Sequence, residues 1–126
     1  MNPLIIQSTE NSLGIHFDSN GTLLIEGKST LKDAQDFFLK LINWVQEYIL
    51  TNPENTVVDA KILYMNSNAN KQFVSLLRKL EALHLAGKKI AVKWHYEQDD
   101  ETILEKGEDF SQIVKIPFEF IEVKEI

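Results

Sequence analysis

The sequence predicts an α/β domain in which a mixed β-sheet carries helices on one face only. Two observations lead to this prediction. Apolar segments of strand length are interspersed with amphipathic segments of helix length along the whole chain. The strand segments also alternate apolar with polar or charged residues, whereas strands covered on both faces are almost continuously apolar. The second face of the sheet is therefore expected to be at least partly exposed to solvent, or to contact a partner.

The N-terminal third predicts short strands joined by a hairpin. Residues 4–6 form a weak strand, and residues 13–17 and 22–27 form two stronger ones. Asn20 and Gly21 lie between the last two. Because both residues tolerate positive φ, Asn-Gly between apolar segments is a strong hairpin signal. The first helix is then expected to open at Thr30–Asp33, a weaker relative of the capping box.

The rest of the chain predicts three further strands and two further helices. The strand at residues 56–64 should direct one set of side chains inward: Val58, Ala60, Ile62 and Tyr64. A long helix follows and should close at Gly87, which suits a left-handed C′ position. A strand at residues 90–96 precedes a short helix at Glu101–Ile113 and a last strand near Phe118. The polar sides of these strands form the expected open face: Asp59, Lys61, Lys93, His95 and Glu119.

Length and charge narrow the class of protein. The 126 residues suit one domain, residues 1–126, with no linker or repeat. A net charge of −6 disfavours nucleic acid and anionic membranes as partners. There is no cysteine for a disulfide or a thiolate site. No apolar segment approaches the ~20 residues that span a bilayer, so a cytoplasmic location is expected.

Ser67 is the residue with the strongest functional signal. It is the one Ser or Thr between Thr56 and Ser75, and it lies where a predicted strand passes into a predicted helix. Helix N-termini present unpaired N–H groups and a partial positive charge, so a phosphate there is stabilised. The alternative is that Asn66, Ser67 and Asn68 only cap the helix. On spacing alone both interpretations stay open.

Catalytic and metal chemistry have little support. The three histidines (His16, His84 and His95) lack ligand spacing, and there is no glycine-rich phosphate loop, so no cofactor or metal is expected. A small enzyme using Tyr96, His95 and the carboxylates around Asp99 is disfavoured, because His95 and Tyr96 should point to opposite faces. The acidic segment at residues 97–101 fits either a solvated helix start or an acidic docking patch.

Several segments together resemble the SiaC family of bacterial regulatory phosphoproteins. They are Ile25–Ser29, Phe37-Phe38, Tyr64–Asn68 with Lys71, Val92–Tyr96, the acidic run Glu97–Glu101, and Gly107–Phe110. Each motif is short, so the specificity lies in their order and spacing, which cover essentially the whole chain. The resemblance implies a fold similar to STAS domains, with a mixed sheet and helices on one face, and a protein that is not itself an enzyme.

The resemblance also implies a partner-switching module. A Ser/Thr kinase phosphorylates one residue, a PP2C-like phosphatase removes the phosphate, and the unphosphorylated form binds and stimulates a diguanylate cyclase, linked to cyclic-di-GMP and biofilm behaviour. Matching the family motif places the phosphorylated residue at Ser67, where the family usually has Thr. Asn68 and Ala69 replace neighbouring hydroxyls, and the Asp-Ser-Ser-Gly signature of anti-sigma antagonists is absent.

The predicted partner-binding residues come from two segments. They are Tyr64, Asn66, Ser67, Asn68, Lys71, Tyr96, Asp99 and Asp100. The alternative function is a constitutive interaction domain or homodimer that contacts its partner through the polar sheet face, or through the exposed ends of Trp94 and Tyr96, without switching. Equal partner affinity of phosphorylated and unphosphorylated protein would favour that alternative.

Overall fold

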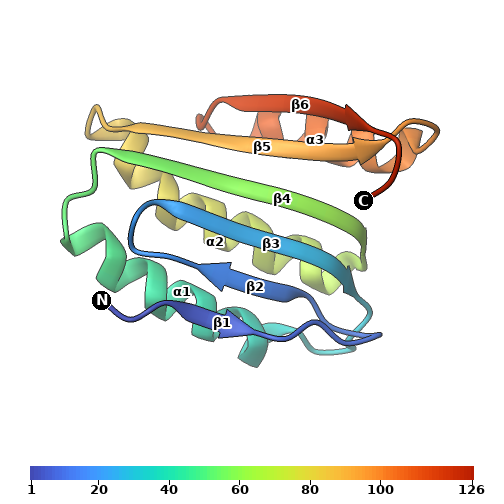
Figure 1. Ribbon diagram of the computed structural model, residues 1–126, viewed down its shortest axis with the longest axis horizontal. Coiled ribbons are helices and arrows are strands. Elements are labelled where there is room, and N and C mark those ends of the chain that lie inside the picture. Colours follow the sequence, from blue (N-terminus) through green and yellow to red (C-terminus); the bar gives the residue numbers. More distant parts are fainter.

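The computed structural model describes all residues, 1–126, and contains one six-stranded sheet whose strands follow chain order (Figure 1). The strands are β1 (Leu4–Ile6), β2 (Gly14–Phe17), β3 (Thr22–Ser29), β4 (Asn55–Met65), β5 (Lys89–Glu97) and β6 (Phe118–Val123). The β1–β2 and β2–β3 pairs are antiparallel, and the three later pairs are parallel. The parallel pairs are connected by α1 (Gln35–Leu50), α2 (Ser67–Leu85) and α3 (Glu101–Ile113).

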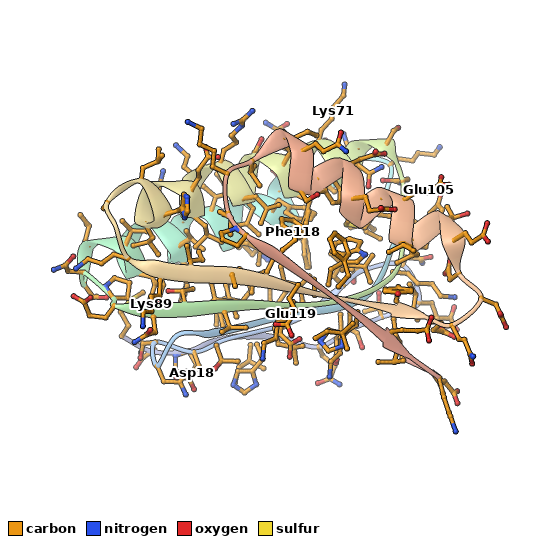
Figure 2. The ribbon with its side chains drawn as sticks, turned by 90° about the horizontal axis from the view of Figure 1, so that it is seen from above. Asp18, Lys71, Lys89, Glu105, Phe118 and Glu119 are labelled. Atoms are coloured by element: carbon orange, nitrogen blue, oxygen red, sulfur yellow. The ribbon has the colours of Figure 1, made fainter.

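All three helices lie on one face of the sheet, as predicted (Figures 1 and 2). A core of 28 buried residues fills the space between the two layers. The other face is open and carries charged side chains, among which His95 Nε2 lies 2.6 Å from Asp59 Oδ1. None of the helices has both the length and the apolar character needed to cross a membrane.

The parallel connections place every helix start at one end of the sheet. β4 and β5 are neighbours and run in the same direction, so the β4–α2 and β5–α3 junctions lie side by side at the right of Figure 1. The sequence expectation for α3, residues 101–113, coincides with the observed helix. The predicted end of α2 is also confirmed: Gly87 has φ 83°, and Lys88 N donates to Leu83 O at 2.9 Å.

The predicted hairpin is present, with one change in its turn. Gly21 has φ 106°, but Asn20 keeps a negative φ, so only one of the two residues uses the left-handed region. Gly21 N donates to Asp18 O at 3.0 Å and closes the turn. A Cβ at Gly21 would lie 2.4 Å from Asn55 O, so this position requires glycine for space as well as for backbone conformation.

The predicted start of α1 is wrong. The helix begins at Gln35, and its N-cap residue Ala34 has no side chain that could accept a capping hydrogen bond. Thr30 Oγ1 instead donates to Asn11 Oδ1 at 2.9 Å. Ala34 N donates to Asn68 Oδ1 at 2.8 Å. Locally, Asp33 Oδ1 accepts from Gln35 N at 3.0 Å. The role expected for Thr30 is replaced by contacts with distant parts of the chain.

Tyr64 was expected to point inward, and this expectation is wrong. The pairing of β3 with β4 shifts there: Gly27 lies opposite Ile62 and Lys28 opposite Tyr64, so Leu63 is an extra residue in β4. Such a β-bulge reverses which side chains face the core beyond it. Tyr64 is accordingly 48% exposed, while Met65 is buried. The bulge delivers an aromatic ring to the surface just before Ser67.

Candidate functional site at the β4–α2 junction

Ser67 is the first residue of α2 and is exposed. Asn66 is the N-cap: its backbone is extended, and its Oδ1 accepts a hydrogen bond from Ala69 N at 3.0 Å. The hydrogen bonds at this junction do not use Ser67 Oγ. The capping role belongs to Asn66, which leaves the Ser67 hydroxyl free for chemistry from outside.

The asparagines on both sides of Ser67 hold the chain segment that precedes α1. Asn66 Nδ2 donates to Leu31 O at 2.8 Å, and Asn68 Oδ1 accepts from Ala34 N at 2.8 Å. Both side chains are partly buried. Two of the predicted partner-binding residues thus have internal hydrogen bonds that fix the backbone around the serine, and their contact with a partner stays a prediction.

Lys106 is a residue of this site that the sequence analysis missed. It comes from α3, yet its Nζ donates to Met65 O at 2.7 Å and to Asn70 Oδ1 at 3.1 Å. The same ammonium lies 5.7 Å from the centre of the Tyr64 ring, within cation–π range. One signal was available: Lys106 lies three residues after Ile103 and four before Phe110, beside the inward stripe of its helix.

Burial lowers the pKa of the Lys106 ammonium, because desolvation disfavours its charged form. The ion pairs of the protein are Arg78–Glu81, Lys88–Glu54 and His95–Asp59, so Lys106 has no carboxylate partner. The hydrogen-bond acceptors of the ammonium are therefore neutral oxygens, and an aromatic ring lies beside it. Lys71, one turn after Ser67, is different: it is exposed and projects away from the helical layer (Figure 2).

The second group of predicted binding residues lies at the neighbouring β5–α3 junction. Asp100 caps α3, its Oδ1 accepting from Ile103 N at 3.0 Å. Asp99 is exposed in the turn before it, and Tyr96 is half-buried and packs against the core. The structure thus brings both predicted groups to the same end of the sheet, where one partner surface could contact them together.

The enzyme arrangement considered from the sequence does not form. His95 pairs with Asp59 on the open face, whereas Tyr96 packs against the core on the helical side. The two groups therefore do not converge on one pocket. No set of three or more acidic or histidine side chains is arranged to hold a metal ion.

Comparison with known proteins assigns the family. The model of the SiaC family of regulatory phosphoproteins matches residues 6–123. The chain belongs to the SiaC family. The family and the one-sided α/β fold inferred from the sequence are thereby confirmed, and the chain is a regulatory protein of bacterial signalling rather than an enzyme.

SiaC relatives from Pseudomonas aeruginosa match over nearly their full length. An uncharacterised protein of strain UCBPP-PA14 is 28% identical over 119 residues, covering 94% of each chain. The structure of SiaC superimposes with a TM-score of 0.87 at 26% identity, covering 98% of this chain and 100% of that one. A chain in the crystal structure of the diguanylate cyclase SiaD in complex with its activator SiaC superimposes with a TM-score of 0.89 at 26% identity. The match covers 95% of this chain and 99% of that one.

Proposed function

We propose that this chain activates a diguanylate cyclase and that phosphorylation of Ser67 turns this activity off. A Ser/Thr kinase adds the phosphate and a PP2C-like phosphatase removes it. One observation carries the proposal: in a family of regulatory phosphoproteins, Ser67 presents an exposed hydroxyl free of internal hydrogen bonds at the first position of α2. The relative of known structure is the activator in a complex with the cyclase SiaD.

The fold should accept a phosphate at Ser67. The first turn of α2 has no acidic residue, so no fixed negative charge in that turn repels the phosphate. A phosphate adds a charge of about −1.5 to −2, which the positive end of a helix stabilises. Ser67 is exposed, and its Oγ forms no internal hydrogen bond that the phosphate would break. Phosphorylation is therefore expected to leave the overall fold unchanged.

Phosphorylation of Ser67 should affect the binding of a partner more strongly than it affects the fold. A cyclase that packs against Ser67 and Tyr64 meets a neutral hydroxyl and an exposed ring. After phosphorylation the same contact must desolvate a dianion, and burial of an unpaired charge is costly. We expect the affinity to fall by about 100-fold, which corresponds to about 2.7 kcal/mol.

The test compares the same charge at two places on one helix. The chain is prepared with phosphoserine at position 67, with phosphoserine at position 75, and as Ser67→Ala. Ser75 is also exposed on α2 and lies eight residues further along, about 12 Å from Ser67. Binding to a purified diguanylate cyclase from the same host, and its rate of cyclic-di-GMP synthesis, are measured for each form.

Only the phosphate at position 67 should weaken binding about 100-fold and lower the stimulation accordingly. The Ser67→Ala protein should bind and stimulate like the unmodified chain. Equal affinity of all forms would contradict the proposal and favour the constitutive interaction domain. Light scattering at several protein concentrations then tests the homodimer alternative. That alternative predicts dimerisation that is unaffected by phosphate at Ser67. Phosphopeptide mapping of protein from the native host checks that Ser67 is the modified residue.

A further inference from the structure

One side chain at the junction has a charge that the proposed function leaves unexplained. The Lys106 ammonium is partly buried, and its hydrogen-bond acceptors, Met65 O and Asn70 Oδ1, are neutral. Lysine ammonium groups that are withdrawn from water are normally paired with an anion. Glu105 and Asp109 line the same hollow between α2 and α3, but neither forms an ion pair with Lys106.

The two acceptors of Lys106 lie on either side of Ser67 in the chain. Met65 precedes it by two residues, and Asn70 follows it by three. Residues three apart on a helix share a face, so the Ser67 side chain lies on the side of α2 from which Asn70 reaches Lys106. The ammonium therefore contacts the chain just before and just after the serine hydroxyl.

We infer that Lys106 is the internal counter-ion of a phosphate on Ser67, and that phosphorylation transfers its ammonium from Met65 O and Asn70 Oδ1 to the phosphate oxygens. This inference rests on the proposed modification of Ser67. An ammonium and a phosphate carry opposite full charges, whereas Met65 O and Asn70 Oδ1 offer only dipoles, and this added Coulomb attraction favours the transfer. The four-carbon stem of lysine allows the head group to move without moving α3.

The transfer would change the surface next to Ser67 as well. In the unmodified chain the ammonium lies over the Tyr64 ring, 5.7 Å from its centre. Once it pairs with the phosphate, the exposed ring loses this cation. Phosphorylation would then alter two features that a partner meets, the charge at Ser67 and the environment of Tyr64.

Lys71 is the competing counter-ion. It lies four residues after Ser67 on the same face of α2, but it is exposed. Exposed ion pairs are screened by water and salt and contribute little. Lys106 is already held against this turn by two hydrogen bonds, so less side-chain freedom is lost when it binds the phosphate. The structure thus favours Lys106 over Lys71.

The test measures the second pKa of phosphoserine 67 by ³¹P NMR titration. Phosphoserine is installed during translation in the otherwise unchanged chain and in Lys106→Gln, Lys106→Arg, Lys71→Gln and Lys79→Gln. A nearby cation stabilises the dianion, so Lys106→Gln should raise this pKa by about one unit. Lys106→Arg should retain most of the low value. Lys79→Gln, which removes one exposed charge further along α2, should leave it unchanged.

A second measurement follows the Tyr64 ring instead of the phosphate. With ¹³C-labelled tyrosine, the Tyr64 ring signals should shift on phosphorylation of the unchanged chain, and they should not shift in Lys106→Gln. Equal phosphate pKa values in the unchanged chain and Lys106→Gln, or a larger rise in Lys71→Gln, would overturn the inference. Tyr64 ring signals that do not shift on phosphorylation of the unchanged chain would also overturn it. No cyclase or kinase is used, so these results are independent of the partner-binding test.

Discussion

The starts of α2 and α3 have the same architecture and opposite electrostatics. Each helix follows a parallel strand at the same end of the sheet, and each has an N-cap side chain that accepts a hydrogen bond at 3.0 Å. The cap of α3 is Asp100, followed by Glu101, so this helix begins with fixed negative charge. The cap of α2 is the neutral Asn66, and its first turn has no acidic residue.

This difference shows where the chain leaves room for regulation. The positive end of α3 is already satisfied by carboxylates that are permanently present. The positive end of α2 has only neutral groups, the Asn66 cap and the Ser67 hydroxyl, and Lys106 adds a cation beside it. An anion would therefore be favourable at the start of α2, where the unmodified chain has none. Four experiments test or refine this comparison.

The largest expected change in stability comes from disturbing the close packing of α3 on Trp94. A Cβ at Gly107 would lie 2.5 Å from Cδ1 and Nε1 of Trp94, whose indole donates to Ile103 O at 2.9 Å. Gly107→Ala should therefore destabilise the protein by about 1–3 kcal/mol, although alanine is the better helix former. Urea unfolding measures the change. Gln112→Ala on the exposed side of α3 is the control, and an unchanged midpoint for Gly107→Ala would contradict the packing argument.

The next effect separates the two caps. Asp100→Ala removes one capping hydrogen bond and should cost about 1 kcal/mol. Asn66→Ala removes the cap and also the bond from Nδ2 to Leu31 O, so it should cost about 2 kcal/mol. Thermal unfolding of both variants beside Ser67→Ala, which should change little, gives the ranking. A reversed order would show that the link to Leu31 adds nothing.

A smaller effect tests the charges alone. Asp100→Asn keeps a capping oxygen but loses the charge, and should destabilise by about 0.3–1 kcal/mol. Ser67→Asp adds a charge to α2 and should stabilise by a similar amount. Both differences should shrink in 1 M salt, where the Debye length is about 3 Å. Salt-independent values would mean that the charges at these termini are not the cause.

The smallest effect at neutral pH concerns the later part of α2. A hydrogen bond from Lys115 N, at 2.6 Å from Glu81 Oε2, lowers the pKa of the Glu81 carboxyl, with Arg78 adding to the shift. A lowered folded-state pKa stabilises the protein above the ordinary glutamate pKa of about 4.3, and this contribution is lost as the pH falls below it. Glu81→Gln should flatten the loss of stability in acid, as measured by urea unfolding at several pH values. If the free energy of unfolding falls equally steeply with decreasing pH in Glu81→Gln and in the unchanged chain, this assignment is contradicted.

Local patterns were sufficient for most of the fold. The bounds of α3 follow from its acidic start and apolar spacing, and the end of α2 follows from Gly87. The polar sides of the strands correctly indicated a sheet with one open face. The place of Ser67, between a strand and a helix, was also predicted from local patterns. In these places the residue that determines the structure lies within a few positions of the structure it determines.

The sequence predictions fail where residues distant in the chain determine the local structure. The start of α1 depends on Asn68, which lies 34 positions from Ala34, and no local pattern contains that contact. The exposure of Tyr64 depends on how β4 pairs with β3 at Gly27. The position of Lys106 depends on its bond to Met65 O, 41 positions away. Each is a tertiary effect that overrides a local preference.

The order of the strands has a consequence for how the molecule is made. Since β1 to β6 are neighbours in the sequence and in the sheet, no strand must be inserted between two that are already paired. Each strand leaving the ribosome finds its docking edge already synthesised. The layer can thus grow outward during translation, and Ser67 emerges before β5, β6 and α3, the helix that supplies Lys106.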